Sequence, residues 1–132
     1  SFQGQLAAVQ LDSGRILWNR EISSHAGFTV DENHVYVTDD ESHIRAFDRF
    51  SGNAIWSNEK LHARGATGPA RVGDYIVVGD MEGFLHWMDR ATGDFVARVQ
   101  LSDQRILVQP FVVGKVLYAY SSDGELAAYT YR

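Results

Sequence analysis

The chain repeats one outline of residues four times, and this repeat limits what it can fold into. Each copy begins with glycine or serine and carries an aliphatic residue two positions later, and three copies reach a turn glycine ten positions from their start. The copies begin at Gly4, Ser42, Gly83 and Gly124. The turn glycines are Gly14, Gly52 and Gly93. Adjacent copies start 38, 41 and 41 residues apart, so a unit of about 40 residues is used repeatedly.

Each unit divides into short strands separated by polar or glycine-containing turns. No stretch has a helical period with caps, so we expect almost no helix. We predict thirteen strands: two in residues 1–22, four in 27–58, four in 66–101 and three in 107–132, the first of the last three being 107–113. Several short strands at a period near 40 residues are typical of β-propeller blades. The sequence therefore predicts an all-β chain, a β-propeller segment of about three four-stranded antiparallel blades.

Composition and charge argue against several other classes of protein. The net charge is −5 and the Lys and Arg residues are scattered, so we expect no nucleic-acid partner. No apolar run approaches the roughly 20 residues that a transmembrane helix needs. The chain has no cysteine, which removes disulfides and thiolate metal sites. It starts at Ser1 inside a repeat, without an initiator Met, a signal peptide or a lipidation cysteine, so we expect a fragment.

Tryptophans occupy fixed positions in the repeat. Trp18 and Trp56 each lie four residues after a turn glycine, and Ala97 stands at that position in the third copy. A ligand could stack on such residues, but a constant offset from a turn favours packing between neighbouring blades. Trp87 replaces the alanine of the other copies and is expected to fill the gap left by Ala97. The residues predicted to carry the repeat are Gly14, Trp18, Gly52, Trp56, Gly83, Trp87, Gly93 and Gly124.

No motif predicts catalysis or a bound cofactor or metal. The histidines do not form an H-x-H or H-x-x-x-H pair, so we predict no metal site; they are His25, His34, His43, His62 and His86. The acidic groups 39–41 and 80–82 lack the pattern of a calcium loop and fit solvated turns. Residues 65–68 lack the Gly-Lys-Ser/Thr ending of a phosphate loop. No Ser, His and acid form a recognisable local triad.

Two segments carry a resemblance to a known family. The turn-plus-tryptophan unit resembles the PQQ-type propeller repeat. Residues 77–87 (VVGDMEGFLHW), with 94–97 (DFVA) and 123–126 (DGEL), resemble the C-terminal part of the BamB family, the propeller lipoproteins of the outer-membrane β-barrel assembly (BAM) machinery. The resemblance runs in register along the whole chain.

The resemblance implies a non-enzymatic scaffold without a cofactor. It implies an eight-bladed ring, held by a lipid anchor at the periplasmic face of the bacterial outer membrane, that binds the POTRA domains of BamA and aids insertion of outer-membrane proteins. The BamA contacts of the family lie on blades upstream of the matched part, so no partner-binding residue is carried over. The lipidated cysteine is also absent, and this chain is expected to lack the main BamA-binding loops.

Two alternatives stay open at this level. The chain resembles, more weakly, a fragment of a PQQ-dependent quinoprotein dehydrogenase, which would need acidic and amide metal ligands at the ring centre. It also fits a repeat module of another periplasmic or surface protein.

An isolated set of about three blades leaves two apolar end faces bare, and such faces favour association. Blades that turn by ~45° in an eight-membered ring need ~40° in a ring of nine and ~60° in a ring of six, by division of the circle. We therefore predict a homo-oligomer, a head-to-tail trimer with nine blades. Three complete blades contain twelve strands, and each chain is predicted to contain thirteen, so each chain in the trimer must accommodate one extra strand.

Overall fold

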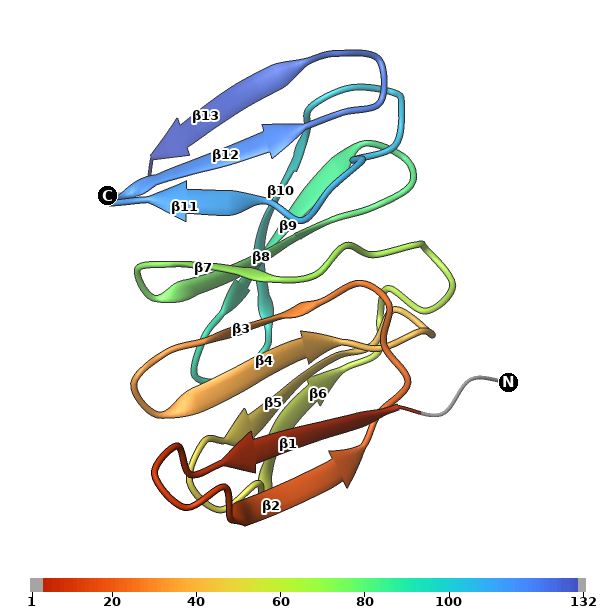
Figure 1. Cartoon of the computed structure of the whole chain (residues 1–132). Coiled ribbons are helices and arrows are strands. Elements are labelled where there is room, and N and C mark those ends of the chain that lie inside the picture. Colours follow the sequence, from red (N-terminus) through yellow and green to blue (C-terminus); the bar gives the residue numbers. More distant parts are fainter. Residues whose placement is uncertain (1–3, 131–132) are drawn as a thin grey trace.

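A computed structural model describes residues 4–130, which form four antiparallel β-sheets stacked one on another (Figure 1). The outermost residues of the predicted first and last segments, 1–3 and 131–132, lie outside the described residues. The described part contains thirteen strands and no helix, so the all-β prediction is confirmed. It therefore contains no helix long and apolar enough to cross a membrane.

Every sheet is built from strands that follow one another in the chain, each antiparallel to the next. The first sheet contains β1 (Gln5–Val9) and β2 (Ile16–Glu21). The second contains β3 (Phe28–Val30), β4 (His34–Thr38), β5 (Ile44–Asp48) and β6 (Ala54–Asn58). The third contains β7 (Ala70–Val72), β8 (Tyr75–Gly79), β9 (Phe84–Asp89) and β10 (Phe95–Gln100). The fourth contains β11 (Phe111–Val113), β12 (Val116–Tyr120) and β13 (Leu126–Thr130).

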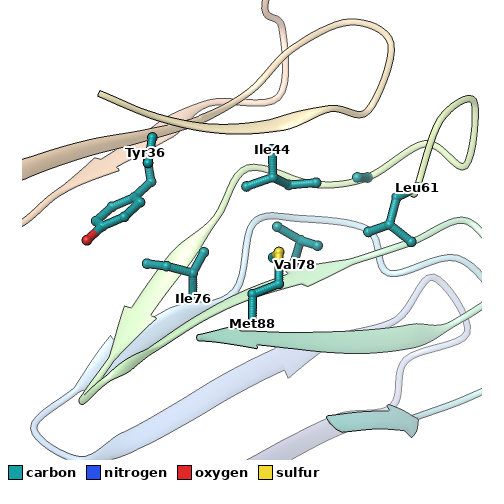
Figure 2. Close-up of a cluster of buried hydrophobic side chains, with 8 residues drawn as sticks. Tyr36, Ile44, Leu61, Ile76, Val78 and Met88 are labelled. Carbon is teal, nitrogen blue, oxygen red and sulfur yellow. The ribbon is translucent and has the colours of Figure 1, made fainter. Parts of the chain in front are cut away.

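The hydrophobic cores lie between the sheets. Alternate residues of a strand point to opposite faces, and in β8 both sets are apolar. Ile76 and Val78 pack in the core shared with the second sheet, whereas Val77 packs in the core shared with the fourth. Figure 2 shows the first of these cores, where Ile76, Val78 and Met88 lie with Ile44 between the second and third sheets. A strand that is apolar on both faces thus needs a neighbouring sheet on each side.

The repeated turn between the last two strands of a sheet is closed by an aspartate and a glycine. Asp48 accepts hydrogen bonds from the backbone N–H groups of Phe50 (2.9 Å) and Ser51 (2.8 Å). Gly52 then takes a positive φ of 75°, which a residue with a Cβ adopts only with strain. Asp89 and Gly93 close the same turn in the third sheet, with a φ of 79° at the glycine.

One predicted strand is shorter than the apolar pattern indicated. The prediction began it at residue 107, but β11 begins at Phe111. Pro110 has no N–H to give to a ladder, and it interrupts the pairing just before β11. Upstream of it, Ile106 forms an isolated bridge with Ser121, and the N–H of Leu107 donates to the carbonyl of Tyr120 at 3.0 Å. The apolar residues before the proline therefore pair only at single points, with the last residue of β12 and with the residue after it.

Candidate functional site: contacts between the sheets and the loops at their edge

The first contact between sheets joins Trp18 of β2 to the turn of the second sheet. The indole N–H of Trp18 donates to the carbonyl of Arg49 at 2.6 Å. Its ring lies on Gly52, where an added Cβ would stand only 2.6 Å from Cδ2 of the indole. Gly52 therefore has two reasons to be glycine, its positive φ and the ring above it.

The second contact repeats the first, one sheet further along. The indole N–H of Trp56 in β6 donates to the carbonyl of Arg90 at 2.9 Å. A Cβ on Gly93 would lie 2.5 Å from Cδ2 of that indole. The amide of Asn58 adds a bond of 2.8 Å to the Gly93 carbonyl. A tryptophan in the last strand of one sheet thus rests on the turn glycine of the next sheet, in both places where the described residues contain the pair.

The other glycines of the predicted repeat set have different surroundings. A Cβ on Gly14 or on Gly124 would meet nothing within 4 Å, although both glycines have positive φ. At Gly83 a Cβ would collide with the carbonyl of Ser102 and lie 2.6 Å from that of Gln104. The backbone therefore passes close to Gly83, while Gly14 and Gly124 lie in exposed turns at the two ends of the stack.

Trp87 differs from the other two tryptophans in strand and in bonding. It lies in β9 opposite Ala97, whereas the corresponding pairs Ala8–Trp18 and Ala46–Trp56 have the tryptophan in the last strand. Its ring packs in the core between the third and fourth sheets, edge-on to Tyr129 at 6.3 Å between ring centroids. Trp87 and Ala97 thus exchange the positions that tryptophan and alanine occupy in the other copies. Within the described residues, Trp87 Nε1 has no hydrogen-bond partner.

A buried aspartate organises the loop between β8 and β9. Asp80 is fully buried, and one carboxylate oxygen accepts bonds from the N–H groups of Glu82 and Phe84. The other accepts from His86 Nε2 at 2.7 Å and from Arg64 at 2.9 Å. Burial raises the pKa of Asp80, but the bonds from His86, the two N–H groups and Arg64 outweigh it and lower the pKa to about 2. His86 is thus a hydrogen-bonded structural histidine.

A second buried carboxylate joins the second and third sheets. Asp31 accepts bonds from the Tyr36 hydroxyl at 2.7 Å and from the Arg90 guanidinium at 3.0 Å. Burial raises the pKa of Asp31, and the bonds from Tyr36, two backbone N–H groups and Arg90 lower it by more, so that it lies below its ordinary value. Arg90 also accepts the Trp56 bond at its carbonyl. No sequence spacing indicated this bridge, because its two charges lie 59 residues apart in different sheets.

The loops at one edge of the stack bring two histidines together. His43 follows the turn after β4, and His62 lies in the loop between β6 and β7. His43 Nε2 and His62 Nδ1 are 3.0 Å apart, and the Glu41 carboxylate faces both rings. Spacing along the chain gave no sign of this pair, because the two histidines lie 19 residues apart. Among the described residues, this is the only group of three His, Asp or Glu that could hold a metal, and it is not the acidic and amide set of a quinoprotein.

Comparison with known proteins decides the family. The family model described as outer membrane protein assembly factor BamB matches residues 1–58 and 40–132, which together cover the whole chain. The chain belongs to the BamB family. It is 40% identical over 130 residues to outer membrane protein assembly factor BamB of Shewanella oneidensis, an alignment that covers 98% of the chain and 33% of the relative. BamB of Pseudomonas aeruginosa is 36% identical over 132 residues, covering 100% of the chain and 35% of that relative.

A solved BamB structure agrees with the fold. The crystal structure of BamB from Moraxella catarrhalis matches with a TM-score of 0.90 and 30% identity, over 97% of the chain and 38% of that structure. The predicted resemblance to BamB and the predicted fold class, an all-β propeller segment of four-stranded antiparallel sheets, are thus confirmed. The chain spans about a third of the length of the two BamB relatives.

Proposed function

We propose that this chain forms part of a non-catalytic scaffold subunit of the outer-membrane β-barrel assembly complex. The observation that carries the proposal is the match to the BamB family along the whole chain. The relatives are named outer membrane protein assembly factors, and this name supports a role at the outer membrane. In this proposal the protein acts at the periplasmic face of that membrane. Its partners there would be the POTRA domains of BamA, bound by the full-length protein.

The geometry suits a scaffold. The buried polar side chains Asp31, Asp80 and His86 are all engaged in bonds that hold turns and sheets in place. The tryptophan-on-glycine contacts fix the first sheet against the second and the second against the third. In this proposal the four sheets are blades or parts of blades, with the predicted bounds 1–22, 27–58, 66–101 and 107–132. Their role is to hold loops in fixed positions for a partner.

Binding to BamA POTRA domains tests the proposal. Purified POTRA domains are immobilised, and a full-length relative such as the Pseudomonas aeruginosa protein is compared with the 132-residue chain by biolayer interferometry. We expect the full-length protein to bind and the short chain to bind at least tenfold more weakly, because the family contacts are expected upstream of it. A full-length relative that does not bind would contradict the proposal. Equal binding by the two would place the docking loops within these 132 residues.

Catalysis is tested separately. The chain is mixed with PQQ and Ca²⁺, and the absorbance of the quinone is followed. An unchanged spectrum is expected of a scaffold, whereas a stoichiometric shift would favour the quinoprotein alternative.

A further inference from the structure

The two histidines brought together at the loop edge have the geometry of metal ligands. His43 Nε2 lies 3.0 Å from His62 Nδ1, and Glu41 Oε2 lies 3.7 Å from the first nitrogen and 4.0 Å from the second. Two imidazole nitrogens and a carboxylate oxygen thus converge on one point, with all three donor atoms within 4.8 Å of one another. A carboxylate and imidazoles are the nitrogen and oxygen ligands that Zn²⁺ takes in proteins.

The spacing fits a tetrahedral ion with small movements. Zinc binds imidazole nitrogen at about 2.0–2.1 Å, and tetrahedral geometry then separates neighbouring ligand atoms by about 3.3 Å. The observed separations of 3.0, 3.7 and 4.0 Å lie on both sides of that value. Mg²⁺ and Ca²⁺ prefer shells of oxygen ligands, so a site with two imidazoles favours zinc over them. A water molecule would complete the four ligands.

The backbone holds the two loops together without help from the histidine rings. The N–H of Ala63 donates to the Glu41 carbonyl at 3.1 Å, and the N–H of Ala66 donates to the Ser42 hydroxyl at 2.9 Å. Ser42, between Glu41 and His43, and Ala63, after His62, both have positive φ, 64° and 60°. Two non-glycine residues in this strained region indicate that the surrounding contacts fix both loops. The two loops that carry the ligands are therefore held side by side without an ion.

A further carboxylate supports one of the histidines. Asp39 Oδ2 lies 3.6 Å from Nδ1 of His43, on the opposite side of the ring from His62. A carboxylate behind a ligating histidine favours the tautomer with the proton on Nδ1, which leaves the Nε2 lone pair for the metal. His62 binds through Nδ1 when its own proton is on Nε2, which faces away from the pair.

We propose that Glu41, His43 and His62 bind a zinc ion, with Asp39 as a positioning residue. The side chains of Glu41 and His62 are 66% and 62% exposed, so an ion reaches the site from solvent. The ion would tie the turn after β4 to the loop that leads into β7. It would therefore strengthen the connection between the second and third sheets, which the prediction of no metal site did not foresee.

Metal binding to the purified chain tests this proposal. Cobalt replaces zinc as a spectroscopic probe, because a tetrahedral Co²⁺ site with nitrogen ligands absorbs in the visible range. We expect one equivalent of Co²⁺ to give these bands, Zn²⁺ to displace them, and Zn²⁺ to raise the melting temperature. His62→Ala should weaken zinc binding more than 100-fold and remove the bands. Its exposed side chain makes loss of folding an improbable cause, and far-UV circular dichroism checks this.

Two further variants keep the test specific. His25→Ala is the matched control, because His25 is another exposed histidine beside a carboxylate, 3.5 Å from Asp40, but has no place in the cluster. It should bind zinc as the parent chain does. Asp39→Asn should weaken zinc binding by about 10–100-fold while keeping the cobalt bands, as expected for support behind a ligand. No cobalt bands in the parent chain, or equal zinc affinity in the parent, the His62→Ala and the His25→Ala chains, would overturn the proposal.

Discussion

The middle and the ends of the stack use the same repeat but bury it differently. In β8 of the third sheet, the residues from Ile76 to Gly79 are all buried. In β13 of the fourth sheet, exposed and half-buried residues alternate along the strand, and Leu126 is 63% exposed. The outward face of the fourth sheet also carries exposed Phe111 and Val113. These sheets therefore have two apolar faces, and whether a face is buried depends on a neighbouring sheet and not on the strand itself.

Substitution of the turn glycines should give the largest difference in stability between the middle and the end of the stack. Gly93→Ala should lower the free energy of unfolding by about 3 kcal/mol, because the methyl group meets the Trp56 ring and an L-residue is strained at positive φ. Gly14→Ala, in the same turn at the end of the stack, has only the strain and should cost about 1 kcal/mol. Urea unfolding at one fixed protein concentration measures both. Equal losses would contradict the tryptophan-on-glycine contact.

The buried aspartate gives the next largest effect. Asp80→Asn should cost about 2 kcal/mol at pH 7, because the Asn side-chain NH₂ would replace a carboxylate oxygen that accepts bonds from Arg64 and His86. Asp80 has a folded pKa of about 2, below its ordinary 3.8, so its contribution is complete above pH 4 and is lost as the pH falls toward 2. The free energy of unfolding of the parent chain and of the Asp80→Asn chain is measured at several pH values. The difference between the two should disappear as the pH falls from 4 toward 2.

An exposed carboxylate at the end of the stack is the control for Asp80. Asp123 also has a lowered pKa, because the hydroxyls of Ser121 and Ser102 donate to it, but it lies in an exposed turn of the fourth sheet. Asp123→Asn should destabilise the chain less than Asp80→Asn does. A larger loss at Asp123 would mean that the turns at the end, and not the middle sheets, hold the fold.

The indole N–H groups of Trp56 and Trp87 should give the smallest difference in stability. Trp56→Phe removes a donor that is bonded to the Arg90 carbonyl and should cost about 1 kcal/mol beyond the lost ring area. Trp87→Phe removes a buried donor that has no partner among the described residues. Removing this unbonded polar group is favourable and offsets part of the lost ring area, so the total cost should be smaller than for Trp56→Phe. Thermal unfolding of both variants measures the difference. A larger loss at Trp87 would reveal a partner for its indole N–H.

The repeat predicted the fold well because its information is local. Strands with a period of two and turns closed by glycine are encoded within about ten residues. Contacts between sheets could be predicted from the sequence only where they recur in the repeat. An example is Trp56, which lies at the same distance from a turn glycine as Trp18 does. The bridge from Asp31 to Arg90 and the pair of His43 and His62 depend on which loops lie side by side. That arrangement comes from stacking, so sequence spacing gave no sign of it.

The central claim is that the apolar faces at the two ends of the stack associate with other copies of the chain. The mass of the isolated chain in solution tests it. Light scattering after gel filtration should give three times the 14.8 kDa chain mass, as expected for a head-to-tail trimer. Leu126→Glu places a charge on the outward face of the fourth sheet and should reduce the mass to that of one chain. Ile55→Glu is the control, because Ile55 is exposed in the second sheet and this sheet already lies between two others. This variant should keep the mass of the parent chain. A parent chain that stays monomeric or dimeric at micromolar concentration would contradict the account.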